Sequence, residues 1–92
     1  MIVELKKRAL RRTKVIEGQI RGLAKMIDQE QYCTDILVQS LAIQKSLASL
    51  DKLLLENHLR THVTHGMSGG SEADKETLTT ELLNIYELSK RG

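Results

Sequence analysis

Residues 33–65 read CTDILVQSLAIQKSLASLDKLLLENHLRTHVTH, a stretch that contains neither proline nor glycine. Apolar residues recur in it, many of them three or four positions apart: Ile36, Leu37, Leu41, Ile43, Leu47, Leu50, Leu54 and Leu59. That spacing is typical of an amphipathic α-helix, because side chains three and four positions apart lie on the same helical face. The stretch therefore predicts one long, continuous helix around which the other elements are organised.

The only cysteine and all three histidines of the chain lie at opposite ends of this predicted helix. In an α-helix Cys33, His58 and His62 share one face to within about 20°, but a rise of about 1.5 Å per residue separates the thiol from the imidazoles by roughly 37 to 44 Å. They meet only if a second copy of the helix packs antiparallel. Because His58 and His62 are one turn apart, they can bind one ion together. The spacing therefore leads to the hypothesis of a Cys–His–His metal site shared between two subunits.

The same residues also have interpretations without a metal. A single cysteine at a helix start is often a small buried apolar residue, and histidines near a helix C-terminus often offset the helix dipole. A catalytic thiol needs its base within about 3 Å, which the separation allows only across subunits. The sequence contains no phosphate-binding glycine loop, nucleophile elbow or His-Glu-x-x-His motif, so we expect no enzyme activity.

The composition indicates one small domain, residues 1–92, that associates with itself. The chain has two tyrosines and no Phe or Trp. A core of aliphatic residues on long helices is thin for a monomer, so we expect an oligomer. A single cysteine favours a reducing compartment. Neither a signal-peptide core nor an apolar run of about 18 residues is present, so we expect a cytoplasmic protein without a membrane segment.

Two further helices are predicted. Residues 3–29 carry an apolar stripe of Leu5, Ala9, Ile16, Ile20, Leu23 and Ile27. The short link 30–32 implies an antiparallel hairpin with the central helix. Gly18 and Gly22 in the first helix either admit another helix at close range or are merely tolerated. After the Gly/Ser-rich segment 66–71, Ser71 and Asp74 predict the start of a third, shorter helix over residues 72–90.

Positive charge is concentrated on the first helix. Residues 1–29 hold eight basic and three acidic residues, whereas the rest holds six basic and nine acidic ones. Such a run is often a solvated face, but its scarce acidic neighbours favour an anionic partner. The lack of aromatic residues disfavours single-stranded nucleic acid. The charge alone leaves nucleic-acid binding and a solvated face both open, and any contact with double-stranded DNA would be made mainly through phosphates and DNA shape.

The segments RRTKVIEGQIRGLAKMIDQEQYCTDIL (11–37) and ENHLRTHV (56–63) resemble the copper-sensitive operon repressor (CsoR/RcnR/FrmR-type) family, whose other members sense nickel or cobalt, formaldehyde or persulfide. The resemblance covers nearly the whole chain. It implies a three-helix, all-α protomer that forms an antiparallel homodimer and a disc-shaped homotetramer. It also implies a repressor that binds operator DNA in its apo form and releases it when metal binds.

The resemblance also implies roles for individual residues. The metal positions carry over to Cys33, His58 and His62. Tyr32 and Glu81 are similar to the outer partners that orient a ligand in the copper members. The DNA face would include Arg12, with Arg8, Arg11 and Lys14 as companions by position and charge.

The identity of the metal is left open by the residues. Thiolate with imidazole suits Cu(I), but also Zn(II), Ni(II) or Co(II). Copper members usually have a second cysteine where this chain has His62. The nickel and cobalt members add a histidine near the N-terminus, formaldehyde sensing uses an N-terminal proline and persulfide sensing uses two cysteines, and this chain has none of these. Cu(I) therefore ranks first by elimination.

Two alternatives belong to other functional classes. A metal-buffering helical protein would bind the ion without DNA, and a plain helical scaffold would use neither. His65 is either an additional ligand or a residue that suits a helix end.

Overall fold

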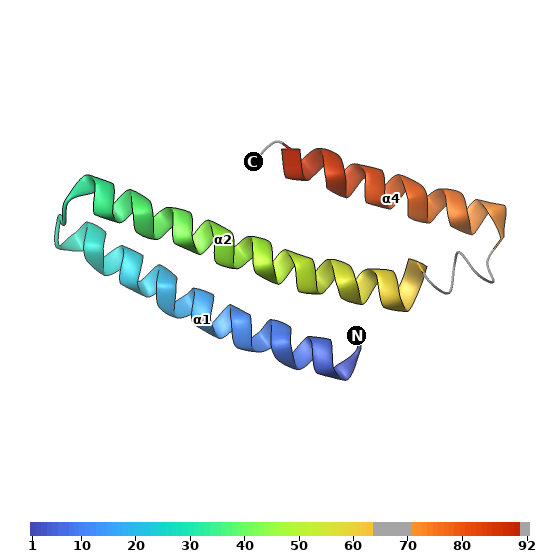
Figure 1. Ribbon diagram of the computed structural model, residues 1–92, viewed down its shortest axis with the longest axis horizontal. Helices are drawn as coiled ribbons and strands as arrows, with labels where there is room; N and C mark the ends of the chain where they lie inside the picture. Colours follow the sequence, from blue (N-terminus) through green and yellow to red (C-terminus); the bar gives the residue numbers. More distant parts are fainter. Residues whose placement is uncertain (64–70, 91–92) are drawn as a thin grey trace. The chain divides into compact units, whose positions relative to one another are not determined.

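The computed structural model describes residues 1–63 and 71–90, and all regular structure in these ranges is helical (Figure 1). The elements in chain order are α1 (Val3–Asp28), α2 (Cys33–His58), the π-helix η1 (Leu59–Val63) and α4 (Glu72–Lys90). The predicted all-α class with three main helices is confirmed. The chain divides into two compact units, Met1–Asn57 and His58–Gly92. Within the described ranges, no helix combines the length and apolar character needed to cross a bilayer.

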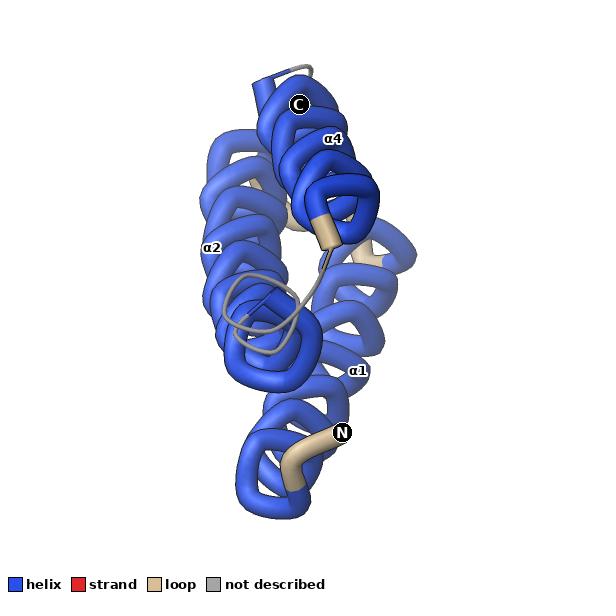
Figure 2. The backbone as a smooth tube through the Cα atoms, turned by 90° about the vertical axis from the view of Figure 1, so that its right-hand side faces the viewer, coloured by secondary structure: helices blue, strands red, loops and turns tan. Residues whose placement is uncertain are grey.

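The first unit is an antiparallel hairpin, in which α1 and α2 run side by side (Figures 1 and 2). The link closes α1 with two backbone hydrogen bonds, from Glu30 N–H to Ile27 C=O at 3.0 Å and from Gln31 N–H to Met26 C=O at 3.0 Å. This pair is a Schellman motif, whose reversal needs a left-handed residue. Glu30 occupies that position with φ 51°. Glycine is usual there, because a side chain in this conformation is strained.

The hydrophobic contact between the two long helices is narrow. The buried apolar residues of the described chain are Leu5, Ala9 and Ile16 on α1, and Ile43 and Leu53 on α2. Other residues of the predicted stripes are more than half exposed: Ile20, Ile27, Leu37 and Leu41. A hairpin gives each helix a single neighbour, so apolar residues beside the line of contact stay in solvent. The apolar stripes that the sequence predicts are therefore broader than the apolar surface that one chain buries.

The prediction of a continuous α-helix as far as His65 is wrong over Leu59–Val63. Residues Leu59–Val63 form a π-helix, whose i→i+5 hydrogen bonds make a wider turn than those of an α-helix. The pattern of apolar residues over five positions does not distinguish these two turns, so the sequence did not reveal the change. Residues 64–70, and His65 with them, lie outside the described part of the chain.

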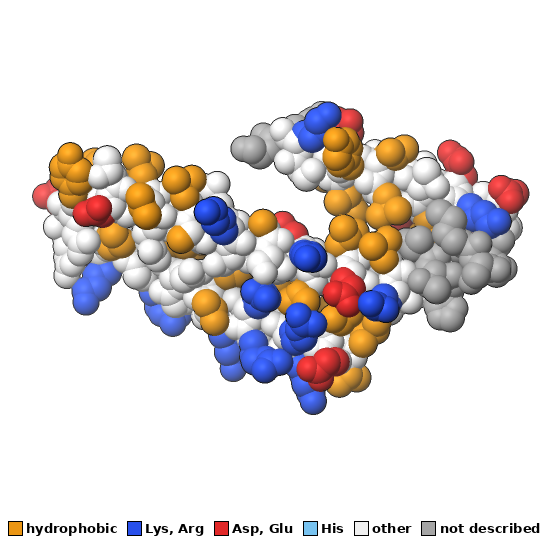
Figure 3. Space-filling view, viewed as in Figure 1, with side chains coloured by type: hydrophobic (Ala, Val, Ile, Leu, Met, Phe, Trp, Pro, Cys, Tyr) orange, Lys and Arg blue, Asp and Glu red, His pale blue; other side chains and the backbone are white. Residues whose placement is uncertain are grey.

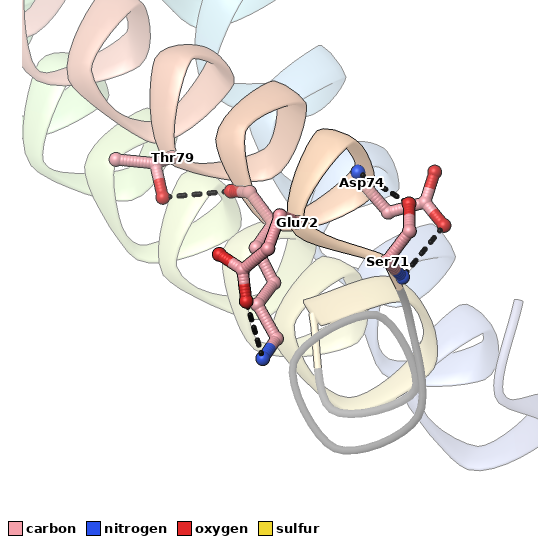
Figure 4. A network of polar contacts seen from close by, with 5 residues as sticks. Ser71, Glu72, Asp74 and Thr79 are labelled. Atoms are coloured by element: carbon pink, nitrogen blue, oxygen red, sulfur yellow. Dashed lines mark hydrogen bonds and ion pairs between the residues drawn. The ribbon is translucent and has the colours of Figure 1, made fainter.

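The start of α4 confirms the predicted capping signal (Figure 4). Asp74 N–H donates to Ser71 Oγ at 3.2 Å, and Ser71 N–H donates to Asp74 Oδ2 at 3.3 Å. The two residues thus satisfy each other's backbone donors, as in a capping box. Lys75 Nζ lies 3.5 Å from Glu72 Oε1 in the first turn. These contacts define where α4 begins and hence where Glu81 falls along it.

Replacing Glu30 with glycine should stabilise the hairpin. The substitution removes the side-chain strain of the left-handed conformation, and we expect the free energy of unfolding to rise by about 1 kcal/mol. The matched control, Glu17→Gly in the middle of α1, should lower it by about 1 kcal/mol. Urea unfolding at one fixed protein concentration measures both changes. Equal destabilisation by the two substitutions would contradict the strain at Glu30.

Candidate metal centre and nucleic-acid interface

The residues predicted to supply the sulfur ligand and one nitrogen ligand lie at the two ends of α2. Cys33 is the first residue of this 26-residue helix, and His58 is the last. At about 1.5 Å per residue, the helix separates them by roughly 37 Å. Among the described side chains of one chain, no three His, Cys, Asp or Glu residues are grouped to hold a metal ion. The structure thus keeps the predicted ligands apart within one chain, as the sequence spacing requires.

Glu81 of α4 lies beside His58 in the second unit. Its Oε2 is 3.4 Å from His58 Nε2, at ion-pair distance, and the two side chains are 48% and 30% exposed. A carboxylate at one ring nitrogen orients an imidazole and selects which nitrogen carries the proton. Among the described side chains that the family resemblance associated with the metal, His58 and Glu81 are brought together from different helices.

The other end of α2 presents an exposed thiol. Cys33 is a free, exposed cysteine, and the side chain of Tyr32 before it is also exposed. The Tyr32 carbonyl accepts hydrogen bonds from the backbone N–H groups of Asp35 and Ile36, at 3.0 and 3.2 Å, and so opens the helix. Tyr32 therefore lies at the Cys33 end of α2, opposite the end that carries His58.

His62 lies in η1, and its side chain is outside the described part of the structure. The sequence prediction placed His62 one α-helical turn after His58. In a π-helix four residues complete less than one turn, so that alignment does not hold unchanged. The wider turn changes the backbone register of residue 62 relative to His58.

The basic residues predicted to face DNA are all exposed on α1, and Figure 3 shows Lys and Arg side chains (blue) gathered along this helix. They do not form one narrow face. Residues of an α-helix are about 100° apart around its axis, so Arg12 and Lys14 lie about 160° apart, and Arg8 and Arg11 lie between them. The four residues form a wide basic arc, with Arg12 at one edge and Lys14 at the other.

The sequence analysis missed that the Lys14 edge continues along α1. Lys7, Lys14 and Arg21 are seven residues apart, and with Lys25 they fall within about 40° of each other around the axis. All four are exposed. The seven-residue spacing of these residues could have revealed this row, but the prediction grouped the denser basic run over residues 7–14 instead. A shallow depression begins this edge, lined by Glu4, Lys7, Leu10, Arg11 and Lys14.

Gly18 and Gly22 lie within the same arc. Apart from its chain neighbours and the backbone of its own helix, no described atom lies within 4 Å of a Cβ placed at Gly22, and near Gly18 only the flexible Arg21 guanidinium approaches, at 3.6 Å. The close approach of another helix, which the sequence left open, is therefore not made within the hairpin of α1 and α2.

Comparison with known proteins identifies the family. The sequence pattern of metal-sensitive transcriptional repressors matches residues 5–89. The chain belongs to this family. Membership in this family of repressors implies DNA binding and self-association rather than enzymatic catalysis.

Individual relatives of this repressor are similar over most of their length. The copper-sensing transcriptional repressor CsoR of Bacillus subtilis is 38% identical over 76 residues, which are 83% of this chain and 72% of the relative. The copper-sensing transcriptional repressor RicR of Mycobacterium tuberculosis is 42% identical over 65 residues, 70% of this chain and 68% of the relative. The crystal structure of the copper-sensing repressor CsoR with Cu(I) from Geobacillus thermodenitrificans superposes with a TM-score of 0.84 and 34% identity, covering 98% of this chain and 91% of that one.

Arg12→Ala and Lys14→Ala, made separately, test the two edges of the basic arc. Each should weaken binding to double-stranded DNA and reduce the magnitude of the salt slope by roughly 0.9 for every phosphate that the variant no longer neutralises. The control is Lys75→Ala on α4, which should leave the slope unchanged. Fluorescence anisotropy over a range of salt concentrations measures the slope. An unchanged slope in both α1 variants would move the DNA interface away from this arc.

Proposed function

We propose that this chain is a Cu(I)-responsive transcriptional repressor, whose apo form binds operator DNA and whose metal-bound form releases it. The observation that carries the proposal is the placement of ligands on α2, which begins at an exposed Cys33 and ends at a His58 that faces Glu81. When two copies of α2 pack antiparallel, Cys33 comes level with the partner's His58 and the partner's His62. A twofold axis then generates two equivalent metal sites.

The exposed apolar side of α2 supports this pairing. Five leucines of α2 are between 37% and 62% exposed: Leu37, Leu41, Leu47, Leu54 and Leu55. Around the helix axis they fall within about 80° of Cys33, on both sides of it. A second copy of α2 seated there would bury the leucines and bring the thiol to the opposite end of its partner. We infer a homodimer of this kind, which assembles further into a homotetramer.

Copper is the metal favoured by the donor set and by the relatives. The donors are one thiolate and two imidazoles, which suit Cu(I), and the relatives described above are named as copper-sensing. The same donors accept Zn(II), and with more difficulty Ni(II) or Co(II), so these ions define the alternative inducers of the same repressor. When bound, Cu(I) supplies a link between the ligand-bearing ends of two subunits.

Other residues of the chain would support the metal ligands or contact DNA. Glu81 at Nε2 would orient the His58 ring and leave Nδ1 as the nitrogen that could bind the metal. Tyr32, next to Cys33, would join the His58–Glu81 pair of the opposing subunit as a further outer partner. Arg8, Arg11, Arg12 and Lys14 would contact DNA phosphates.

Metal and DNA oppose each other if the two ligands favour different placements of the paired hairpins. The coupling free energy is then equal in both directions, so DNA also weakens metal binding. We further propose that residues 1–92 act as a single functional domain in the cytoplasm, where the thiol of Cys33 stays reduced.

Exchanging Cys33 for alanine should separate DNA binding from metal response. We expect Cys33→Ala to bind operator DNA as tightly as the unaltered protein and to stay bound when Cu(I) is added, because the bridging sulfur is gone. Thr34→Ala, at the neighbouring exposed position, is the matched control and should release DNA normally. Electrophoretic mobility shift with the chain's own promoter region reads out both. Full Cu(I)-dependent release by Cys33→Ala would remove Cys33 from the site.

Neutralising Glu81 should weaken metal binding without removing a ligand. Glu81→Gln keeps the shape of the side chain but loses the carboxylate that orients His58, and we expect Cu(I) affinity to fall by about 10- to 100-fold. Glu87→Gln, further along α4, is the control. Competition against a Cu(I) chelator measures both affinities. An affinity equal to that of the unaltered protein would show that Glu81 does not tune the ligand.

The decisive experiment adds Cu(I), Zn(II), Ni(II) and Co(II) separately to the repressor–DNA complex and measures release. Release by Cu(I) at the lowest free concentration supports the proposal. Selective release by another ion would retain the repressor and replace its inducer. DNA binding without release by any of the four would contradict the metal-responsive mechanism.

A further inference from the structure

Asn57 is the buried polar residue of the described chain, and it joins the two ends of the hairpin. Its side chain is on the last turn of α2 and the residue is 8% exposed. Asn57 Oδ1 accepts a hydrogen bond from the backbone N–H of Ile2 at 2.9 Å, across 55 positions of sequence. A buried amide of this kind is costly to leave without a partner, so the contact fixes which part of α1 meets the end of α2.

The hydrogen bond supplies a cap that α1 lacks in its own sequence. The first backbone N–H groups of a helix have no partner within the helix. Ile2 is the N-cap residue of α1, and it makes no side-chain capping bond. In a capping box the third helical residue bonds back to the N-cap N–H, but here that residue is the buried Leu5. Asn57 takes over this bond from the other helix of the hairpin.

The first turn of α1, which this hydrogen bond holds, carries positive charge. Lys6, Lys7 and Arg8 follow directly in α1 and are exposed. Fraying of an uncapped first turn would scatter these charges and lower their local density along the helix. The residue after Asn57 is His58, the proposed metal ligand. One hydrogen bond therefore connects the start of the basic arc with the turn that ends at the ligand.

We propose that Asn57 is a positioning residue for DNA binding, which holds the basic first turn of α1 in place and carries part of the effect of metal at His58 to that turn. This inference rests on the proposed function above. Hydrogen bonds weaken steeply with distance and misalignment, so a small rotation of the last turn of α2 is enough to break this one. The two states are then a capped and a frayed start of α1.

Three variants separate the acceptor from the packing. Asn57→Leu keeps a similar volume and a strong helix former but removes the acceptor. Asn57→Asp keeps an acceptor and places negative charge at a helix N-terminus, where it is favourable. Asn84→Leu, at an exposed site on α4, controls for the same substitution elsewhere. Circular dichroism and oligomeric state establish that each variant folds and assembles.

The first measurements are made on the apo protein. We expect Asn57→Leu to speed amide hydrogen exchange in the first turn of α1 and to weaken DNA binding by about tenfold, the size of one hydrogen bond to a buried group. Asn57→Asp should restore both toward the values of the unaltered protein, and Asn84→Leu should change neither. Exchange and DNA affinity in Asn57→Leu equal to those of the unaltered protein would overturn the proposal. So would equal losses in Asn57→Leu and Asn57→Asp.

Removing the donor of this hydrogen bond, the Ile2 N–H, gives an independent test. This test also decides whether the bond matters if Asn57→Leu does not fold. Ile2 has φ −63°, which proline adopts without strain, so Ile2→Pro removes the N–H while keeping the backbone conformation. Both this variant and its reference carry a short N-terminal extension that retains Met1. Ile2→Pro should reproduce the exchange and DNA defects, and the double variant with Asn57→Leu should be no worse than either single one. Fully additive losses would contradict a shared bond.

The coupling is measured as the factor by which Cu(I) lowers DNA affinity. In Asn57→Leu this factor should shrink severalfold while Cu(I) still binds with the same stoichiometry. An unchanged factor would confine Asn57 to holding α1 and overturn its part in the metal response. If the unaltered protein showed no Cu(I) effect, the proposed function would fail, whereas the apo measurements would still decide the capping role.

Discussion

The length of α2 is the constraint on which the rest of this protein depends. An unbroken α-helix of 26 residues places Cys33 and His58 at its two ends. No side-chain motion spans that distance, so one chain cannot bring the thiol and the imidazole to one ion. A site built from these residues needs two helices lying head to tail. The proposed function is therefore a property of the assembly, and the protomer supplies two half-sites.

The small core fits the same requirement. A hairpin of two helices buries one line of apolar residues and leaves five leucines of α2 exposed to solvent. In a monomer this exposure is unfavourable, but it provides the surface that a second copy needs. In the proposed dimer, folding and site assembly would draw on the same apolar side of α2, so the metal would act on an interface that also stabilises the protein.

The backbone groups at the helix ends find their hydrogen-bond partners in three different ways. Two of these caps are local and the third comes from another helix. α4 starts with a local capping box between Ser71 and Asp74, which involves no other element. α1 ends in a Schellman motif that Glu30 closes from a strained conformation. The start of α1 depends on Asn57 of another helix. A local cap depends only on its own residues, whereas a cap borrowed from the end of α2 ties the start of α1 to that end.

The sequence by itself determined the features that arise from neighbouring residues. The three-helix class, the bounds of α1 and α4, the cap at Ser71 and the separation of Cys33 from His58 all follow from periodicity, turn chemistry and counting along one helix. The resemblance pointed to Glu81, and the structure placed it beside His58. Only the tertiary structure decided that Leu53 is buried while Leu37 and Leu41 are not, that the helix widens into a π-turn after His58, and that Asn57 bonds to Ile2. These features depend on which surfaces meet across the hairpin or on small differences in backbone hydrogen bonding, and neither leaves a periodic trace in the order of the residues.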